Sequence, residues 1–274
     1  MRLPRFCMRC RTGDGGAAMR KSKIALATRR WMVVTCLLLI TVIIYWYLNR
    51  RGLRWYSQWP AKMDLKLSKL ECQRPQKELD SMADLAHRTY RTFDKLSITS
   101  FLTYGTLFGA LRYRGPVPWD LDVDMGVVGA TIDRYSLSQL REAFRKEGVT
   151  IHYEQYGGLY KLRRDGMSVD IFPYYNTYGG EWMYRHGLES YIFFVNYRYH
   201  HRFPKSLLKE PLPKIEFGGV MMNMTRGRYK LQSYLFRDDW SIEVRPPGCE
   251  SVQVEGRRDP VIVTYAPEDP DNYA

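Results

Sequence analysis

Apolar and polar positions follow three successive patterns along the chain. Residues 31–48 form an unbroken apolar run without an ionisable acid or base. From Leu79 to Leu96 apolar residues recur every three or four positions, which predicts an amphipathic helix covering a sheet. Beyond residue 97 the apolar runs are short and several alternate with polar residues, as in strands.

Strands and helices are expected to alternate in this last region. The expected elements are strands at 99–103, 120–128, 149–153 and 215–222, helices at 104–112, 131–146 and 228–236, and a hairpin of 159–162 with 167–174. The hairpin turn contains Asp165-Gly166, a strong turn signal. This order predicts an α+β (mixed α/β) fold with a mixed central sheet.

The apolar run at 31–48 is long enough to cross a bilayer. Its 18 residues would extend about 27 Å as a helix, and aromatic residues lie near both ends. A core helix of that length would carry polar positions. A cleavable signal peptide would have a shorter leader than the 30 residues present here. We therefore expect an uncleaved transmembrane signal-anchor.

The charge of the chain is concentrated at its start. There are 42 Lys and Arg against 29 Asp and Glu, a net charge of +13. The first 54 residues hold twelve of the basic residues and one acid, so the remaining 220 are close to neutral. A folded domain without a basic field argues against nucleic acid as a partner. The 45% hydrophobic content excludes a disordered chain, and five cysteines are too few for a disulfide scaffold.

The basic flank of the apolar run predicts a type II topology. The positive-inside rule places residues 1–30 in the cytosol as a tail, so everything after the anchor is lumenal. We expect a stem at 49–75, a folded catalytic domain at 76–245 and a loosely ordered tail at 246–274. Cys72 and Cys249 could form one disulfide on that side, although the sequence does not show that they meet. Asn223 begins a lumenal N-glycosylation sequon.

Three carboxylates lie within five residues of one predicted strand. Asp120, Asp122 and Asp124 would project from the same face, because side chains alternate along a strand. Carboxylates at this spacing raise one another's pKa unless a cation lies between them, and Mg²⁺ prefers such oxygen ligands. The alternative is an exposed polar edge. Asp is depleted in strands, which favours the metal site.

A fourth carboxylate lies in the apolar segment Ser168–Phe172. Buried without a partner, Asp170 would be costly, so it must be paired or bind metal. If its hairpin lies beside the first acidic strand, Asp170 completes the cluster. A salt bridge from Asp170 to Arg163 or Arg164 is about equally compatible with the sequence.

Two motifs in order resemble the LicD family. They are GTLFGALR at 105–112 and PWDLDVDMG at 118–126, followed by VDIFPYY at 169–175. The resemblance covers roughly residues 79–239 and is closest to the fukutin and fukutin-related protein branch. It implies a nucleotidyltransferase-like fold and a divalent ion, Mg²⁺ or Mn²⁺, held by the Asp-x-Asp pair. It also implies transfer of ribitol phosphate or phosphocholine from a CDP-activated donor to a glycan or glycoprotein acceptor.

Roles for individual residues follow from the chemistry and the resemblance together. Asp122, Asp124 and Asp170 are the expected catalytic and metal-binding residues. The expected substrate-binding residues are Gly105, Thr106, Arg112, Trp119, Asp120 and Lys161. The amides of Gly105 and Thr106 open a helix and suit a phosphate, although both glycines of GTLFGA are equally compatible with close helix packing. Trp119 is more compatible with core packing than with base stacking, and His201 is interpreted as surface.

The sequence therefore predicts a Golgi membrane phosphotransferase, with the endoplasmic reticulum as an alternative address. Two other functions stay open: a nucleotide-sugar glycosyltransferase that uses Asp-x-Asp, and an inactive lumenal accessory protein. A homo-oligomer is also left open.

Overall fold

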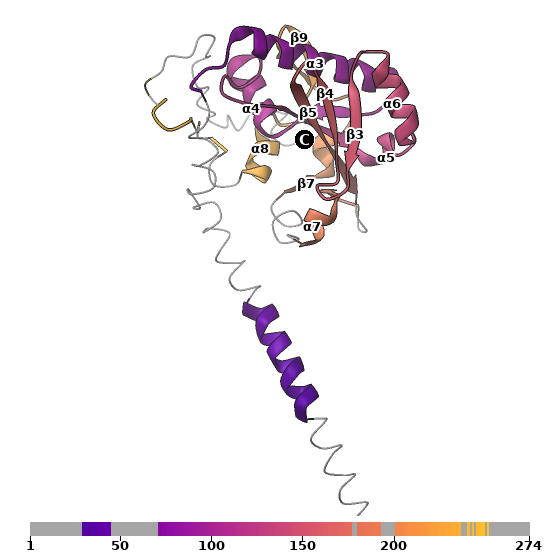
Figure 1. The fold of residues 1–274 in the computed structure, drawn as a ribbon, viewed down its shortest axis with the longest axis vertical. Coiled ribbons are helices and arrows are strands. Elements are labelled where there is room, and N and C mark those ends of the chain that lie inside the picture. The colour runs from indigo at the N-terminus through magenta and orange to yellow at the C-terminus, as the bar shows by residue number, and fades with distance from the viewer. Residues whose placement is uncertain are drawn as a thin grey trace, which may run out of the picture. The chain divides into compact units, whose positions relative to one another are not determined.

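The structure is a computed structural model that describes residues 29–44, 71–176, 180–192, 201–236, 240–241, 243, 245–249 and 251. The chain divides into two compact units, residues 1–58 and 59–274. In the first, residues 29–44 form a helix with exposed apolar side chains (Figure 1). Within the described residues, no helix combines the length and apolar character that a membrane span requires. Residues 45–48 of the predicted anchor lie outside the described part, as do most of the predicted tail, stem and C-terminal segment.

The second unit is built on a mixed sheet of seven strands among the described residues. Its main order is β1 (Ser100–Leu102), β2 (Val123–Val128), β5 (Met167–Asn176), β4 (Leu159–Arg164) and β3 (Thr150–Glu154). The sheet continues from β5 through β6 (Trp182–Arg185) to β7 (Arg202–Pro204). Only the β2–β5 pair is parallel among these described strands. The predicted α+β class with a mixed sheet is confirmed.

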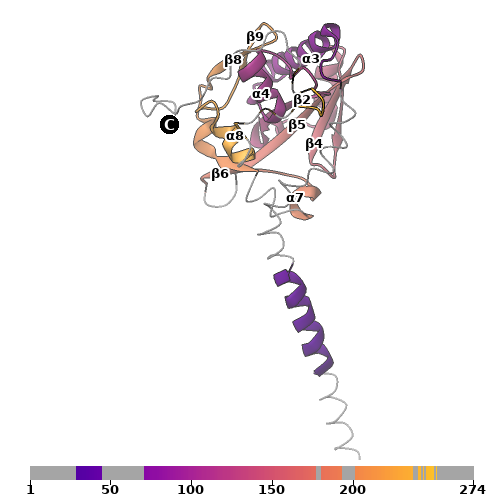
Figure 2. The ribbon, with the colours of Figure 1, turned by 90° about the vertical axis from the view of Figure 1, so that its left-hand side faces the viewer.

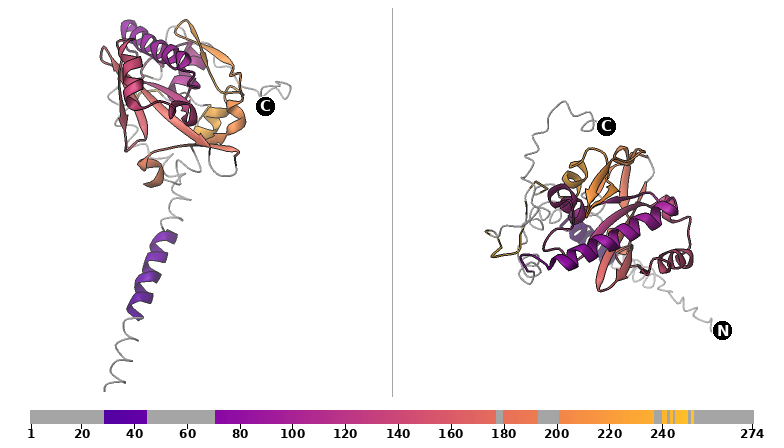
Figure 3. Two further views of the ribbon diagram at one scale, coloured as in Figure 1. Left: turned by 90° about the vertical axis from the view of Figure 1, so that its right-hand side faces the viewer. Right: turned by 90° about the horizontal axis from the view of Figure 1, so that it is seen from above.

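One face of the sheet is apolar and covered by helices. Helix α3 (Gln76–Lys95) packs on β5 and buries Leu79, Met82 and Phe93, as its three-and-four periodicity predicts (Figure 3). Helix α6 (Leu137–Arg145) packs on β3. Val169 and Ile171 of β5 are fully buried. Because strand side chains alternate, Asp170 between them faces the opposite side of the sheet.

Helices α4 (Tyr104–Tyr113) and α8 (Lys230–Leu235) contact each other, and α4 packs on β2 (Figure 2). The hairpin of β8 (Lys214–Phe217) and β9 (Val220–Asn223) contacts α4 and β1. The described elements also include a 3-10 helix at Lys205–Leu208 and a short helix α7 (Leu188–Ile192).

Two predicted elements have different limits in the structure. The helix expected at 131–146 is two helices, α5 (Gly129–Ile132) and α6. Ser136 starts the second, because its hydroxyl and the Gln139 side chain form a capping box. The strand expected at 120–128 starts only at Val123, since residues 117–120 form a turn in which the Asp120 amide donates to the Val117 carbonyl, 3.0 Å.

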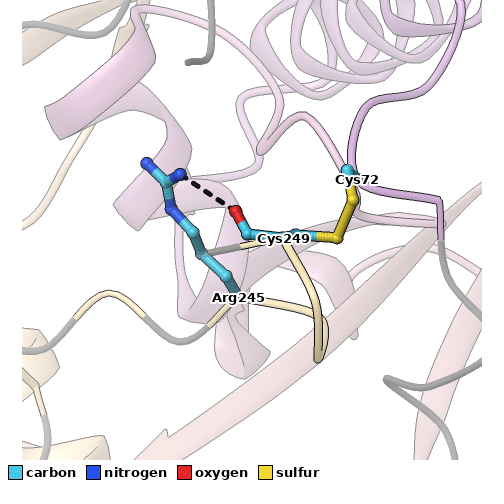
Figure 4. The surroundings of a disulfide bond; sticks show 3 residues. All are labelled: Cys72, Arg245 and Cys249. Atoms are coloured by element: carbon cyan, nitrogen blue, oxygen red, sulfur yellow. Dashed lines mark hydrogen bonds between the residues drawn. A yellow bond between two sulfur atoms is a disulfide. The ribbon is translucent and has the colours of Figure 1, made fainter. Parts of the chain in front are cut away.

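A disulfide joins the two ends of the folded unit. Cys72 and Cys249, whose Cα atoms are 5.3 Å apart, are bonded across 177 positions of sequence. Arg245 donates from Nη1 to the Cys249 carbonyl at 3.3 Å (Figure 4). Near Cys72, the Arg74 amide donates to the Pro118 carbonyl at 2.7 Å. The segment around Cys249, predicted to be loose from residue 246, is therefore fixed at least as far as its disulfide.

Candidate active site

Asp120 and Asp124 lie over Gly105 at the start of α4. A Cβ atom added to Gly105 would be 2.8 Å from Asp120 Oδ2 and 4.0 Å from Asp124 Oδ2. The absence of a side chain at Gly105 is therefore what lets the Asp120 carboxylate approach the helix start. The structure brings together the two sequence motifs, GTLFGALR and PWDLDVDMG, that predicted a common site.

Thr106 holds the strand that carries Asp124. Its Oγ1 accepts a hydrogen bond from the Asp124 amide at 2.6 Å. The Thr103 amide, one turn earlier, donates to the Asp124 carbonyl at 3.3 Å. The start of α4 therefore fixes the backbone of Asp124 from both sides, and the Thr106 oxygen has a structural role in addition to any contact with phosphate.

Asp120 and Asp122 do not lie on a strand, so the expectation that three carboxylates alternate along one strand is wrong. Asp120 lies in the turn before β2, where its Oδ1 accepts from the Leu121 amide at 2.9 Å. Asp122 immediately precedes β2, and Asp124 is its second residue. Pro116 and Pro118 in this approach disfavour regular strand pairing.

Asp170 lies next to Asp124 on the parallel neighbour strand. The two residues are paired in register between β2 and β5, so their side chains leave the sheet on the same face. On its other side Asp170 is paired in register with Lys161 of β4. Lys161 Nζ lies 3.1 Å from Asp170 Oδ2 and 3.6 Å from Glu154 Oε2. The salt bridge considered for Asp170 therefore exists, but with Lys161 instead of Arg163 or Arg164.

The electrostatics of Asp124 reflect this crowding. Its side chain keeps a partial opening to solvent, yet desolvation raises the pKa of its carboxyl well above the usual range. The negative charges of Asp122, Asp120 and Asp170 raise that pKa further, while Arg185 lowers it. Burial lowers the pKa of the Lys161 ammonium, but its bonds to Asp170 and Glu154 outweigh this and raise it overall. Among the described residues, the positive charge of Arg185 therefore does not offset the effect of burial and of the neighbouring carboxylates on Asp124.

Two predicted substrate-binding residues, Arg112 and Trp119, contact other parts of the fold and not the carboxylates of the site in the interactions seen here. Arg112 donates to the Ser241 carbonyl at 3.1 Å, lies 3.8 Å from Glu243 and stacks on Phe108. Trp119 is buried against the Tyr113 ring, with Arg245 beyond it. The structure therefore uses Arg112 to hold the C-terminal segment, and Trp119 packs in the interior, as favoured by its sequence context.

Two residues that the sequence did not assign to the site lie beside it. Arg185 of β6 acts electrostatically on Asp124, and its guanidinium lies 4.6 Å from the centre of the Phe172 ring. His201, interpreted as surface, lies with Nδ1 3.4 Å from the Tyr104 hydroxyl, which also accepts from Tyr174 at 3.2 Å. No alternating pattern had predicted β6 or β7, so neither residue could be placed from the sequence.

In the described part of the chain, no three His, Cys, Asp or Glu side chains form a ready-made metal-ligand group. The binding of a divalent ion by Asp122, Asp124 and Asp170 stays a prediction.

Asn223 is used inside the fold. Its Nδ2, the atom that would carry a glycan, donates to the Ser100 carbonyl at 3.1 Å. Its Oδ1 accepts from the Tyr90 hydroxyl at 3.2 Å, and Thr225 of the sequon is fully buried. Glycosylation of Asn223 stays a prediction, and it would leave Nδ2 with one N–H where the free amide has two.

Part of the described domain matches a known family model. Residues 97–225 match the family model described as LicD/FKTN/FKRP, nucleotidyltransferase domain, a segment that contains Gly105, all four Asp residues and Lys161. The match supports the LicD family and a transferase, and it does not single out the fukutin branch.

The individual proteins and solved structures that match this chain have low sequence identity to it. Uncharacterized protein RP689 of Rickettsia prowazekii is 26% identical over 144 residues, which are 51% of this chain and 48% of that protein. The match thus spans about half the length of that relative. Among solved structures, the solution structure of the antibiotic-resistance factor ANT(2'')-Ia has 13% identity and a TM-score of 0.36, covering 56% of this chain and 69% of that one. The crystal structure of ANT(2'')-Ia with adenylyl-2''-tobramycin has 12% identity and the same TM-score, with coverage of 56% and 74%.

Proposed function

We propose that this chain is a type II membrane phosphotransferase of the Golgi lumen. It moves a phosphorylated alcohol, of the ribitol phosphate or phosphocholine type, from a CDP-linked donor to a glycan hydroxyl. The observation that carries the proposal is geometric: Asp120 and Asp124 lie over Gly105, and Asp170 is in register beside Asp124 on the neighbouring strand. The neighbouring carboxylates also raise the pKa of Asp124. Gathered carboxylates of this kind require a cation, and the donor of such a reaction brings a diphosphate that binds one.

In this proposal Asp122, Asp124 and Asp170 would hold a hard divalent ion. Asp122, Asp124 and Asp170 supply carboxylate oxygens, the ligands that Mg²⁺ and Mn²⁺ prefer. When bound, the ion would neutralise charge on the diphosphate of the donor. Among the described residues, Asp170 has its own ammonium partner, Lys161 at 3.1 Å, which keeps a positive charge at the site for an incoming phosphate.

The reaction is a displacement at phosphorus. The acceptor hydroxyl oxygen forms a bond to the phosphorus of the transferred group, and the bond from that phosphorus to the CMP oxygen breaks. In this proposal Asp170 either binds the ion or accepts the proton of the hydroxyl. The start of α4 positions donor phosphate through the amides of Gly105 and Thr106. Such transfer depends mostly on positioning and charge neutralisation, so a small set of fixed groups is sufficient.

Two features support a lumenal location. The Cys72–Cys249 disulfide joins the only two cysteines predicted to face that side, and disulfides persist in oxidising compartments. The apolar run at 31–48, with its basic N-terminal flank, fits a signal-anchor.

The test is a donor screen with the full chain in detergent. CDP-ribitol, CDP-choline and CDP-glycerol are offered beside UDP- and GDP-sugars, with Mg²⁺ or Mn²⁺, and release of CMP or nucleoside diphosphate is measured. We expect CMP from one CDP donor, and a loss of at least about 100-fold when Asp122 and Asp124 are both replaced by Asn. Asp84→Asn, on the exposed side of α3 beside Arg88, is the matched control and should retain activity.

The other functions correspond to other outcomes. Turnover of a nucleotide sugar alone would assign a glycosyltransferase. A chain that shows no metal-dependent binding of CDP by calorimetry, with intact folding, would be an accessory protein. Full activity in the Asp122 and Asp124 double variant would refute the proposed site.

A further inference from the structure

Tyr104 has a strained backbone at the turn between β1 and α4. Its φ is 46°, in the left-handed region that a bulky residue rarely adopts. Such a conformation is costly and persists only where the surrounding contacts fix it. The next residue is Gly105, over which Asp120 and Asp124 lie. The strained residue therefore borders the candidate active site, at the point where α4 begins.

The side chain of Tyr104 is fixed by the sheet. It is buried, and its ring packs edge-on against Phe172 of β5, with 5.1 Å between the ring centres. Its hydroxyl accepts a hydrogen bond from the Tyr174 hydroxyl at 3.2 Å. Phe172 and Tyr174 lie on the same face of β5 as Asp170, because side chains alternate along a strand. These contacts fix the ring, and a separate contact fixes the backbone.

Gln232 of α8 holds the backbone of Tyr104. Its Nε2 donates a hydrogen bond to the Tyr104 carbonyl at 2.6 Å, although 128 positions of sequence separate the two residues. The contact is possible because helices α4 and α8 lie against each other (Figure 2). Residue 232 lies beyond the segment 97–225 that matches the family model, so the matched segment does not contain this contact.

Packing alone does not account for a glutamine at position 232. The side chain is fully buried, and its Oε1 has no hydrogen-bond partner among the described residues. A buried polar atom without a partner destabilises a fold, whereas a methionine of similar length would fill the space without such an atom. The orientation of the amide follows from the bond, because a carbonyl oxygen can only accept. The hydrogen bond to Tyr104 is therefore what Gln232 supplies and an apolar residue would not.

The start of α4 transmits this constraint to the carboxylates. The Thr103 amide donates to the Asp124 carbonyl, and the Thr106 hydroxyl accepts from the Asp124 amide. Tyr104 lies between these two contacts in the sequence. A shift of the Tyr104 carbonyl would therefore move the amides at the start of α4 and the backbone of Asp124 together. A displacement of about 1 Å in groups that position a substrate can reduce a rate about 100-fold.

We propose that Gln232 is a positioning residue, which holds the Tyr104 carbonyl and so keeps the start of α4 in the geometry that the donor phosphate and Asp124 require. This inference rests on the proposed function. It assigns a role in donor binding to α8, a helix that lies beyond the family match.

The test replaces Gln232 by Met, which preserves the length of the side chain and removes the hydrogen bond; Gln232→Leu is a second apolar replacement with the same expectation. Ser233→Ala is the control on the same helix, because its hydroxyl donates to the Lys230 carbonyl within α8. Leu140→Ala, at a fully buried position of α6, is the control for stability.

Kinetics of CMP release by the full chain in detergent distinguish positioning from stability. We expect Gln232→Met to lower kcat/KM for the CDP donor at least about tenfold and to raise the donor KM. A smaller folded fraction would lower kcat alone. Leu140→Ala should therefore lower Tm at least as much as Gln232→Met and keep the donor KM of wild type, and Ser233→Ala should behave like wild type.

Hydrogen exchange tests the same contact without turnover. The amides of Leu107 and Asp124 both donate to oxygens at the start of α4. In Gln232→Met both should exchange at least about fivefold faster, as the loss of one hydrogen bond predicts, and in Ser233→Ala at the wild-type rate. Unchanged exchange in Gln232→Met, or faster exchange with an unchanged donor KM, would overturn the proposal. Absence of CMP release by wild type would refute the proposed function, and the exchange rates would then decide by themselves whether Gln232 holds the start of α4.

Discussion

Asp124 is a carboxylate whose surroundings oppose its negative charge. Burial and three neighbouring carboxylates raise its pKa. Between the unfolded pKa, about 3.9, and the higher folded pKa, the folded protein keeps a proton that the unfolded chain has lost. The free energy of unfolding therefore falls as pH rises through this window, and above it the full penalty remains.

Asp124→Asn should therefore stabilise the domain while abolishing turnover. We expect its Tm in EDTA to exceed that of wild type at pH 8, and the difference to shrink as the pH falls below about 4, where the unfolded chain of wild type also takes up the proton. Thermal unfolding across pH measures this. Mg²⁺ should raise the Tm of wild type and not that of the variant. A variant less stable than wild type at pH 8 would contradict the electrostatic interpretation.

The two glycines of GTLFGA have different roles, one at the site and one in helix packing. A Cβ on Gly109 would lie 2.3 Å from the Gly115 carbonyl oxygen and 3.0 Å from the Val117 nitrogen, which are backbone atoms. A Cβ on Gly105 would meet the Asp120 carboxylate, a side chain that can move. The close-packing alternative therefore holds for Gly109, whereas Gly105 makes room for a site carboxylate.

Gly109→Ala should destabilise the fold by about 1–3 kcal/mol through overpacking. Gly105→Ala should lower Tm less and instead reduce CMP release, because the displaced Asp120 carboxylate leaves its position. Each variant is the control for the other in paired unfolding and activity measurements. Equal loss of Tm in both, with equal residual activity, would show that Gly105 has only a packing role.

At the scale of elements, the site is a row across three strands. Asp124, Asp170 and Lys161 are successive partners on β2, β5 and β4. The pairing of β4 with β5 could be predicted from the sequence, because Asp165-Gly166 is a strong signal for a hairpin turn. In the structure both turn residues have positive φ, 49° and 80°. The parallel pairing of β2 with β5 was not, because nothing local in either strand specifies which neighbour it takes.

Lys161→Met should make the thermal stability of the domain depend more strongly on a divalent ion. Removing the ammonium 3.1 Å from Asp170 leaves the carboxylates without that cation. We expect a lower Tm in EDTA than wild type and a larger rise in Tm on adding Mg²⁺, both measured by calorimetry. Lys95→Met, which breaks an exposed pair with Glu147, is the control and should leave the Mg²⁺ response unchanged. An unaltered Mg²⁺ response in Lys161→Met would separate Lys161 from the metal site.

The residues missed by sequence reasoning share one cause. Arg185 and His201 come from the region of β6 and β7, whose pairing places Tyr184 opposite Arg202. These strands have four and three residues, too short for alternation to be recognised. Asp120, by contrast, was predicted to lie at the site although it is in a turn and not on a strand. Its carboxylate lies close to Asp124 in either backbone conformation, because the two residues are only four positions apart.

At the scale of the whole molecule, one covalent bond closes the folded unit. Cys72→Ser should lower the free energy of unfolding by about 2–5 kcal/mol, since the bond restricts a loop of 177 positions in the unfolded chain. Denaturant unfolding measures this, and non-reducing electrophoresis confirms the bond in wild type. Cys36→Ser changes a free cysteine in the other unit and should have no such effect. Equal stability of Cys72→Ser and wild type would show that Cys72 and Cys249 are not bonded.

The 177 positions between Cys72 and Cys249 also determine when the disulfide can form during synthesis. At about 5–20 residues per second, roughly 10–35 s pass between the emergence of Cys72 and that of Cys249. Throughout that interval Cys249 is not available to the thiol of Cys72, while both carboxylate strands are being made. The bond can close only after Cys249 has been translated, so a chain terminated before that residue keeps a free thiol at Cys72.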